Sequence, residues 1–348
     1  MLVDRIEARW IDTFEAAFRL CEVVAGDEVT ILSESQSRAI NTHLAELALL
    51  RIGARPFHLI MPTPAQSAPV PVRSTGSSVA LQQVQAVLAA LKASKLVVDL
   101  TVEGLMHSDE TPEILGAGGR ILYISNEHPE ALERMAPDAS IIPRVLKGRS
   151  MMQAAKTMHV TSAAGTDLSV GLDGARIGGN LGATIAPGSL ATWPGGICSC
   201  FPARGTVNGV LVLAEGDINI TFKRYLEKPI RLVIEKDYVA AVEGQGTDAD
   251  LMRAYFDAWN DPEAYGTSHV GWGMNHGARW ESLMLYDKGD INGIEARAFA
   301  GNFLFSTGAN PFADRHTLGH FDLPVRGCTI TLDNTPVVVD GKLVPELA

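Results

Sequence analysis

Two short segments in the last third of the chain place metal-binding side chains close together. In the first, His320 and Asp322 flank Phe321. In an extended strand, side chains at positions i and i+2 emerge on the same face, so the imidazole and the carboxylate can meet one ion while Phe321 turns into the core. In the second, His269 lies within the glycine-flanked stretch 266–273, which can bring a third ligand close.

A set of two imidazoles and one carboxylate on one side of a metal leaves about three coordination positions open. Non-haem iron(II) oxygenases use this arrangement to hold a substrate and dioxygen together. A His-x-Asp pattern also occurs in surface strands and in hydrogen-bonded pairs, and the same ligands suit zinc-dependent hydrolysis. Spacing alone therefore indicates a candidate metal site and leaves its chemistry open.

The first half of the chain alternates helical stretches with short apolar runs. This pattern predicts a Rossmann-like α/β domain with a parallel sheet and helices on both faces. Buried strands are expected at Val29–Leu32, Pro56–Ile60, Leu96–Leu100 and Ile121–Ile124. Helices are expected at residues 4–24, 38–52, 79–94 and 129–136, with a loop rich in Pro and Ser at 62–78. No glycines follow the first strand to let the backbone approach a pyrophosphate, so this sheet need not bind NAD.

The second half changes to glycine-rich strands with little helix between them, which favours an antiparallel or mixed sheet in an α+β domain. The strands are expected at Met158–Ala163, Asp167–Leu172, Thr206–Leu213, Pro229–Ile234 and Tyr238–Val242. One helix, Asp248–Trp259, is expected to begin with Asp248 as its N-cap. We place the boundary near residues 150–157, which gives a first domain at 1–155 and a metal-binding catalytic domain at 156–348.

Composition excludes several classes of partner and site. The 348 residues carry a net charge of -11, which would repel a polyphosphate, so nucleic acid is not an expected partner. No apolar run has the length of a membrane span or a secretory signal, so we expect a cytoplasmic protein with no membrane contact. Four scattered cysteines do not form a disulfide framework. Cys198 and Cys200 have one residue between them, which favours two small residues on one strand face over a zinc or redox motif.

Four stretches of the second half carry a resemblance to a known family: Asn260–Gly266, Ser268–Gly273, Ala296–Gly308 and His320–Pro324. Together they resemble the 2,5-dihydroxypyridine 5,6-dioxygenases of nicotinate and nicotine breakdown. Weaker similarity runs through the first half, at Leu96–Asp99 and Leu105–Ser108. The resemblance covers most of the chain and is most specific between residues 260 and 332.

This resemblance implies an Fe(II) enzyme with His269, His320 and Asp322 as the metal ligands. It implies that a hydroxypyridine reacts with dioxygen, that the ring opens between carbons 5 and 6, and that 2,5-dihydroxypyridine yields N-formylmaleamate. It also implies that His107 is the base for the substrate hydroxyl and that the chain forms a homo-oligomer. A histidine suits that role because it titrates near neutral pH. The alternative for His107 is a structural histidine at the end of a strand-like run.

Three further residues are candidates to contact the substrate. Ser306 and Arg297 lie in the stretch most like the family, although Arg297 could instead pair with a structural carboxylate. Thr192 stands where the family, as aligned here, carries a histidine before the residues that match Trp193 and Pro194. This departure changes the expected pocket wall and weakens the inference about the substrate more than the inference about ring cleavage. The glycine-rich segment 171–188 also differs from the family.

The family is related in fold to metallo-aminopeptidases of the thermophilic type, which bind two metals through additional glutamates. The stretch expected to supply the first of them, Pro194–Cys198, has no carboxylate, although Glu243 could supply a missing ligand. A zinc or cobalt aminopeptidase is therefore the alternative enzyme. A catalytically silent protein that binds a small aromatic compound is a third hypothesis.

Overall fold

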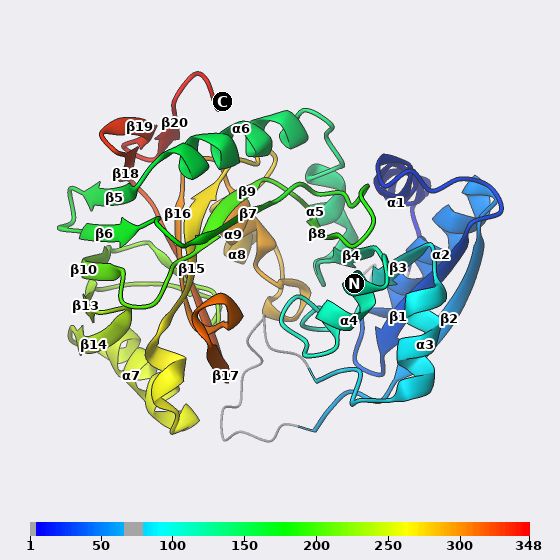
Figure 1. The fold of residues 1–348 in the computed structure, drawn as a ribbon, viewed down its shortest axis with the longest axis horizontal. Coiled ribbons are helices and arrows are strands. Elements are labelled where there is room, and N and C mark those ends of the chain that lie inside the picture. Colours follow the sequence, from blue (N-terminus) through cyan, green and yellow to red (C-terminus); the bar gives the residue numbers. More distant parts are fainter. Residues whose placement is uncertain (1–4, 66–78) are drawn as a thin grey trace.

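A five-stranded parallel sheet organises the N-terminal part of the molecule in this computed structural model, which describes residues 5–65 and 79–348 (Figure 1). The strand order is β2-β1-β3-β4-β8. These strands are β1 (Glu28–Glu34), β2 (Arg55–Met61), β3 (Leu96–Asp99), β4 (Ile121–Ile124) and β8 (Leu190–Trp193). The four strands predicted in the first half are thus confirmed, and β8 is added from residues beyond the predicted boundary. The prediction that all four are buried is wrong for β2, which lies at the edge of the sheet and is mostly exposed.

Helices pack on both faces of this sheet, as the alternation of apolar runs predicted. The helices that accompany this sheet are α1 (Ala8–Leu20), α2 (Ala39–Ile52), α3 (Gln85–Ala93), α4 (Thr111–Gly116) and α5 (Pro129–Arg134). The next helix, α6 (Ile141–Ala154), packs on the antiparallel part of the molecule. Val98 is buried in a cluster with α1 and α2, whereas Val97 is buried in a cluster with α3 and α4. Neighbouring side chains of a strand point to opposite faces of the sheet, so β3 contributes to the apolar core on each face.

The predicted helix at 79–94 is shorter in the structure. Residues 80–83 form a turn in which Gln82 and Gln83 have φ values of 49° and 56°, in the left-handed region that a continuous helix excludes. The helix therefore begins only at Gln85. Of the loop predicted at 62–78, residues 62–65 have no regular secondary structure, and 66–78 lie outside the described residues.

In addition to a two-stranded sheet of β11 (Ile218–Asn219) and β12 (Arg224–Tyr225), two large antiparallel sheets form the rest of the molecule, in agreement with the α+β prediction. The larger has the order β14-β13-β10-β6-β5-β18-β19-β20 and the smaller the order β17-β16-β15-β9-β7. The strands of the larger sheet are β5 (Thr157–Ser162), β6 (Asp167–Gly171), β10 (Val207–Leu213), β13 (Ile230–Glu235), β14 (Tyr238–Glu243), β18 (Cys328–Leu332), β19 (Thr335–Val339) and β20 (Lys342–Leu343). Those of the smaller are β7 (Arg176–Asn180), β9 (Ile197–Phe201), β15 (Thr267–Gly273), β16 (Phe303–Asn310) and β17 (Arg315–Val325).

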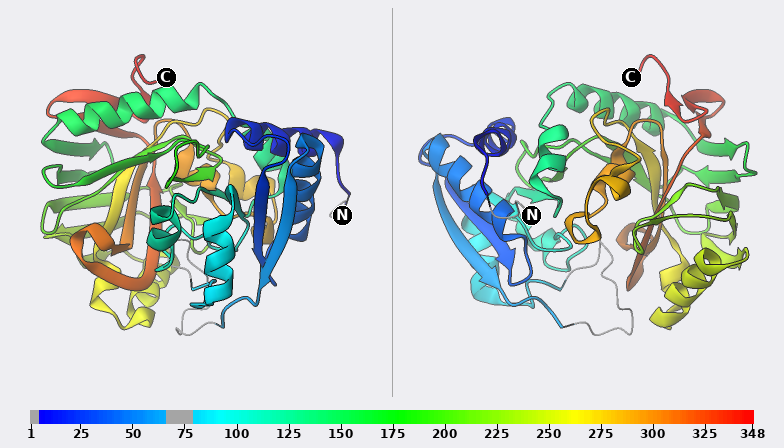
Figure 2. Two further views of the ribbon diagram at one scale, coloured as in Figure 1. Left: turned by 45° about the vertical axis from the view of Figure 1, so that its right-hand side comes forward. Right: turned by 180° about the vertical axis from the view of Figure 1, so that it is seen from behind.

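One large apolar core holds the two antiparallel sheets together. It includes Val160 of the larger sheet, Phe305 of the smaller sheet and Val145 of α6, which crosses this half of the molecule. Cys198 and Cys200 are both buried in the same core, as two small residues on one strand face were expected to be. Seen from behind, the parallel sheet and the antiparallel sheets lie on opposite sides of the molecule, with α8 (Ser282–Leu285) and α9 (Ile294–Ala298) between them (Figure 2).

The helix predicted at Asp248–Trp259 is present as α7 (Thr247–Trp259), but the predicted N-cap is wrong. Gly246 is the N-cap residue, and Asp248 lies within the first turn. The Asp248 carboxylate accepts a hydrogen bond from the Glu227 N–H at 2.9 Å and pairs with Arg224 at 2.7 Å. The Asp248 carboxylate thus forms an ion pair with Arg224, whereas the local sequence pattern predicted that it caps the helix.

The chain crosses from the parallel sheet to the smaller antiparallel sheet through one short connection. β8 ends at Trp193, a cis peptide bond joins Trp193 to Pro194, and β9 begins at Ile197. The carboxyl ends of the parallel strands therefore lie beside the smaller sheet. Within the described ranges, no helix combines the length and the apolar character that crossing a bilayer requires.

Candidate metal centre

Three neighbouring strands of the smaller antiparallel sheet bring His269, His320 and Asp322 together. β16 pairs with β17 in a register that sets Ser306 opposite Asp322, and β15, which carries His269, pairs with the other edge of β16. The Nε2 atoms of His269 and His320 lie 3.7 Å and 3.3 Å from Asp322 Oδ1. One ligand atom from each of the three residues lies within 4.8 Å of the others. The three side chains that the sequence singled out thus share one site.

The surroundings give two of these side chains the protonation states that metal binding requires. Burial lowers the pKa of His269 to about 4, so its imidazole is neutral at physiological pH. Burial by itself would raise the pKa of Asp322, but the charge of Arg297 and the neighbouring His320 hold it well below its usual range. His320 Nδ1 is buried without a hydrogen-bond partner in the described part of the chain. This donor set fits a divalent metal ion such as Fe(II).

Ser306 and Arg297 both contact the carboxylate of the candidate site. The Ser306 hydroxyl donates a hydrogen bond to Asp322 Oδ1 and lies 3.1 Å from His269 Nε2. Arg297 Nε donates to Asp322 Oδ2 at 2.5 Å. The Arg297 side chain also lines the adjacent cavity. Such contacts orient a carboxylate ligand and tune the metal that it binds.

His107 lies beside the two histidines of the candidate site. Its ring centroid is 5.6 Å from that of His320 and 6.5 Å from that of His269, and the ring of Phe201 approaches it edge-on. Burial, reinforced by the neighbouring imidazoles, lowers the pKa of His107 to about 3. The sequence led us to expect titration near neutral pH. In the structure the imidazole instead stays neutral across the physiological range, and burial makes it a weaker base than a free histidine.

A buried carboxylate shapes the loop that carries His107. Asp99, the last residue of β3, accepts hydrogen bonds from the N–H and the hydroxyl of Thr101 at 3.0 Å and 2.7 Å. Its other oxygen accepts from the Leu105 N–H at 2.8 Å. Burial raises the pKa of Asp99 to about 6. Because these bonds fold residues 100–106 around one side chain, they determine where His107 enters the site.

A second buried carboxylate anchors the segment that carries Arg297. Glu127, which follows β4, accepts hydrogen bonds from the backbone N–H groups of Asn292, Gly293 and Ile294 at 2.8, 2.6 and 2.9 Å. These donors lie at the N-terminal end of α9, where N–H groups lack partners within the helix. The bonds tie the parallel sheet to the position of Arg297.

A cavity of about 200 Å³ lies between the carboxyl ends of the parallel strands and the candidate metal site. Its volume suits one aromatic ring. One side is formed by His269, His320, Asp322 and Arg297. The other, which follows the ends of the parallel strands, includes His107, Tyr123, Ser125 and Thr192. Six of the seven site residues proposed from the sequence line this cavity. The seventh, Ser306, lies directly behind it against Asp322.

Sequence analysis missed several residues of this cavity. Ser125 directly follows β4, and ligands in open α/β sheets bind outside the carboxyl ends of the strands, so its position was a usable signal. Asn180 lies in the segment 171–188, which was set aside as unlike the family. Its side chain accepts hydrogen bonds from Gly182 and Thr192 N–H groups and donates to the Pro194 carbonyl. No local pattern indicates those partners.

Glu243, considered as an additional ligand, lies elsewhere. It is exposed on β14 and pairs with Arg231 at 2.6 Å. In the described ranges, His269, His320 and Asp322 form the one group of at least three potential ligands with metal-binding spacing.

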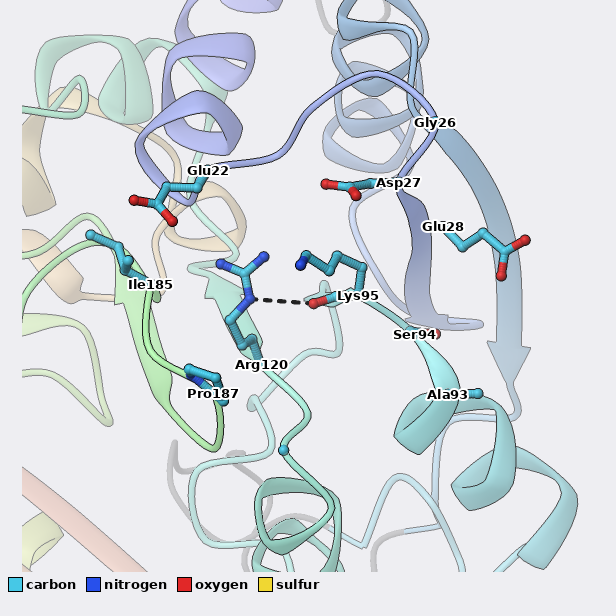
Figure 3. Close-up of a pocket in the computed structure, with 11 residues that line it drawn as sticks. Glu22, Gly26, Asp27, Glu28, Ala93, Ser94, Lys95, Arg120, Ile185 and Pro187 are labelled. Atoms are coloured by element: carbon cyan, nitrogen blue, oxygen red, sulfur yellow. Dashed lines mark hydrogen bonds between the residues drawn. The ribbon is translucent and has the colours of Figure 1, made fainter.

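A second hollow lies at the opposite, amino-terminal edge of the parallel sheet (Figure 3). Its lining includes Arg120, Lys95 and the acidic residues Glu22, Asp27 and Glu28. The Arg120 guanidinium donates to the carbonyl oxygens of Lys95, Cys21 and Thr184, at distances from 2.6 to 3.3 Å. The arginine therefore ties three loops together. The acidic residues of this hollow do not form a group with metal-binding spacing in the described ranges.

Comparisons with known proteins agree with this geometry. The family model described as NicX: 2,5-dihydroxypyridine 5,6-dioxygenase matches residues 9–345. The 2,5-dihydroxypyridine 5,6-dioxygenase of Pseudomonas putida KT2440 is 36% identical over 343 residues, which cover 97% of this chain and 96% of the relative.

Solved structures give the same picture. The structure of 2,5-dihydroxypyridine dioxygenase from Pseudomonas putida KT2440 superimposes with a TM-score of 0.93 at 34% identity, and the match covers 99% of this chain and 100% of that one. Wild-type AmpT from Thermus thermophilus superimposes with a TM-score of 0.61 at 15% identity, over 97% and 99% of the two chains. The second likeness shows a shared fold alone.

Proposed function

Because this chain belongs to the 2,5-dihydroxypyridine 5,6-dioxygenase family and is a dioxygenase, we propose that it is an Fe(II) enzyme that opens the ring of 2,5-dihydroxypyridine or a close hydroxypyridine. The observation that carries this proposal is the cluster of His269, His320 and Asp322 at the wall of a cavity that suits one ring. Two neutral imidazoles and one ionised carboxylate are the ligands that non-haem iron oxygenases use.

His269, His320 and Asp322 would hold the iron, which when bound supplies the redox chemistry for the reaction of dioxygen with an aromatic ring. The remaining tasks belong to the chain. Ser306 and Arg297 bond to opposite oxygens of Asp322 and so fix the orientation of this carboxylate. We propose that Arg297, which lines the cavity, also contacts the substrate. For Ser306, which lies behind the cavity wall against Asp322, a substrate contact stays a prediction from the sequence.

His107 is the proposed base. Its neutral imidazole faces the cavity next to the metal ligands, so it can take the proton from the 5-hydroxyl oxygen of the substrate. Loss of this proton makes the ring electron-rich, which favours its reaction with dioxygen. The bond between ring carbons 5 and 6 then breaks, and 2,5-dihydroxypyridine plus one dioxygen gives N-formylmaleamate with both oxygen atoms retained.

Thr192 is the proposed substrate contact on the parallel-sheet side. It is buried, lines the cavity, and its backbone N–H is held by Asn180 at 3.0 Å. Its position is therefore fixed before any substrate binds.

Isotope labelling tests the proposed reaction. The protein is loaded anaerobically with Fe(II), given 2,5-dihydroxypyridine and ¹⁸O₂, and the product is analysed by mass spectrometry. We expect N-formylmaleamate with two ¹⁸O atoms and the uptake of one dioxygen per substrate. A product with one labelled oxygen, or peptide hydrolysis without oxygen uptake, would contradict the proposal.

A further inference from the structure

Two hydroxyl side chains project from the carboxyl ends of adjacent parallel strands into the cavity. β4 and β8 pair in a register that sets Tyr123 opposite Thr192. Ser125 lies two residues beyond Tyr123, and its N–H donates to the Trp193 carbonyl at 2.9 Å. Since side chains at i and i+2 share a face, Ser125 and Thr192 belong to one wall. Both line the cavity.

Both hydroxyls lack a protein partner. Ser125 is 1% exposed and Thr192 is 5% exposed, and neither hydroxyl makes a hydrogen bond to any residue that the structure describes. Neither oxygen is among the fully buried polar atoms that lack a partner, so both hydroxyls are open to the cavity. With no protein partner, each can donate a hydrogen bond to, and accept one from, a polar ligand in the cavity.

The neighbouring polar groups are already engaged. The Tyr123 hydroxyl donates to the Val102 carbonyl at 3.2 Å and accepts from the Asn292 amide at 3.1 Å. The Asn180 side chain bonds through both its oxygen and its nitrogen. At this wall, Ser125 and Thr192 remain to recognise a ligand.

The charges around the cavity limit what that ligand can be. Arg297 is the one Lys or Arg among its described lining residues, and it is bonded to Asp322. Glu103, a carboxylate, also belongs to the lining. Away from the metal itself, a carboxylate substituent on the ring would therefore meet no uncommitted cation and would lose its hydration without compensation.

We propose that Ser125 and Thr192 determine specificity by binding the ring N–H and the 2-carbonyl of a 5-hydroxy-2-pyridone, the tautomer of 2,5-dihydroxypyridine with an amide edge. A hydroxyl both donates and accepts, so one can accept from the N–H while the other donates to the carbonyl. The substrate class is then uncharged hydroxypyridones, and ring-carboxylated relatives are excluded. This inference rests on the proposed function and adds the residues that select its substrate.

Binding measurements on matched variants test it. Ser125→Ala and Thr192→Val are loaded with metal and titrated with 2,5-dihydroxypyridine under argon, with Ser169→Ala, an exposed serine on β6, as the control. Each cavity variant is expected to bind about five- to tenfold more weakly, the effect of losing one hydrogen bond between neutral groups. Binding of phenol, which has neither amide group, should not change. The control should bind both compounds like the wild type.

A carboxylated probe completes the test. The wild type is expected to bind 2,5-dihydroxypyridine-3-carboxylate, which keeps the amide edge and the 5-hydroxyl and adds a carboxylate beside the 2-carbonyl, at least about tenfold more weakly than 2,5-dihydroxypyridine. Wild-type affinity in both cavity variants, or an equal loss for phenol, would overturn the specificity assignment while turnover by the wild type leaves the proposed function intact. A wild type that neither binds nor oxidises 2,5-dihydroxypyridine would overturn both.

Discussion

The two walls of the cavity are built in different ways. On the antiparallel-sheet wall, the candidate metal ligands contact one another and their supporting groups directly, and strand register sets their spacing. On the parallel-sheet wall, neutral hydroxyls and the His107 loop follow strand ends, and the buried carboxylate of Asp99 holds this loop by accepting hydrogen bonds from its backbone. The first wall suits a fixed metal, and the second suits recognition of a particular ring. Substitutions on the first wall should therefore impair metal binding, and substitutions on the second should impair substrate binding or catalysis.

Removal of a proposed metal ligand from the antiparallel-sheet wall should have the largest effect on activity. His320→Ala is expected to lose bound iron and oxygen uptake together, since the remaining pair of ligands cannot hold the metal. His316→Ala is a matched control on the same strand, because His316 is 72% exposed and outside the site. Metal content and oxygen consumption are measured on both. Normal iron content and normal turnover in His320→Ala would show that His320 is not a metal ligand.

Loss of the proposed base should break the opposite wall without disturbing the metal. His107→Ala is expected to keep its iron and to lose about 10²- to 10⁴-fold in kcat, the usual contribution of a positioned base. Because burial lowers the pKa of His107 to about 3, no loss of wild-type rate from its protonation is expected between pH 5 and 8. Steady-state kinetics across that range check both points. A variant with full activity at every pH would exclude His107 as the base.

A change behind the metal ligands should weaken the first wall more gently. Arg297→Gln removes the cation that holds Asp322, and we expect about 10- to 100-fold weaker iron binding. Arg231→Gln is the control, because it breaks only the exposed pair with Glu243. Competition with a chelator gives the two affinities. Equal affinities would show that Arg297 does not support the ligand.

The smallest effect concerns the carboxylate behind the His107 loop, and it is a pH effect on stability. Burial raises the pKa of Asp99 from 3.8 to about 6, so the folded protein holds this proton more tightly than the unfolded chain does. Its contribution to the free energy of unfolding therefore falls as pH rises from about 4 to 6. Asp99→Asn should abolish that fall.

Urea unfolding at several pH values measures this difference between the wild type and Asp99→Asn. The effect should be confined to the range between about pH 4 and pH 6. Parallel stability profiles for the two proteins across this range would contradict the raised pKa.

Local patterns in the sequence predicted most of the first wall. Alternation along a strand predicts that His320 and Asp322 share a face, and β17 confirms the strand. The approach of His269 depends on β15 pairing beside β16, a long-range contact that no spacing encodes. The glycine-flanked stretch around His269 indicated a possible third ligand, and the resemblance to the family assigned it to the same metal as the other two.

The second wall was less predictable. The strands β1, β3 and β4 were read from apolar runs, but β8 joins the same sheet from a distant glycine-rich segment. This strand places Thr192 beside Tyr123, so that hydroxyl side chains line the parallel-sheet wall of the cavity. The N-cap prediction at Asp248 failed for a related reason, since a tertiary partner, Arg224, competes for the carboxylate. The division into 1–155 and 156–348 stays a prediction, and β8 shows that the two halves share a sheet.

The most direct test of the account is a titration of metal-free protein with Fe(II) under argon, followed by measurement of oxygen uptake with 2,5-dihydroxypyridine at each step. One metal held by His269, His320 and Asp322 predicts that activity rises linearly and reaches its plateau at one iron per chain. A plateau at two metals per chain, or equal activity with zinc and no iron, would contradict the account.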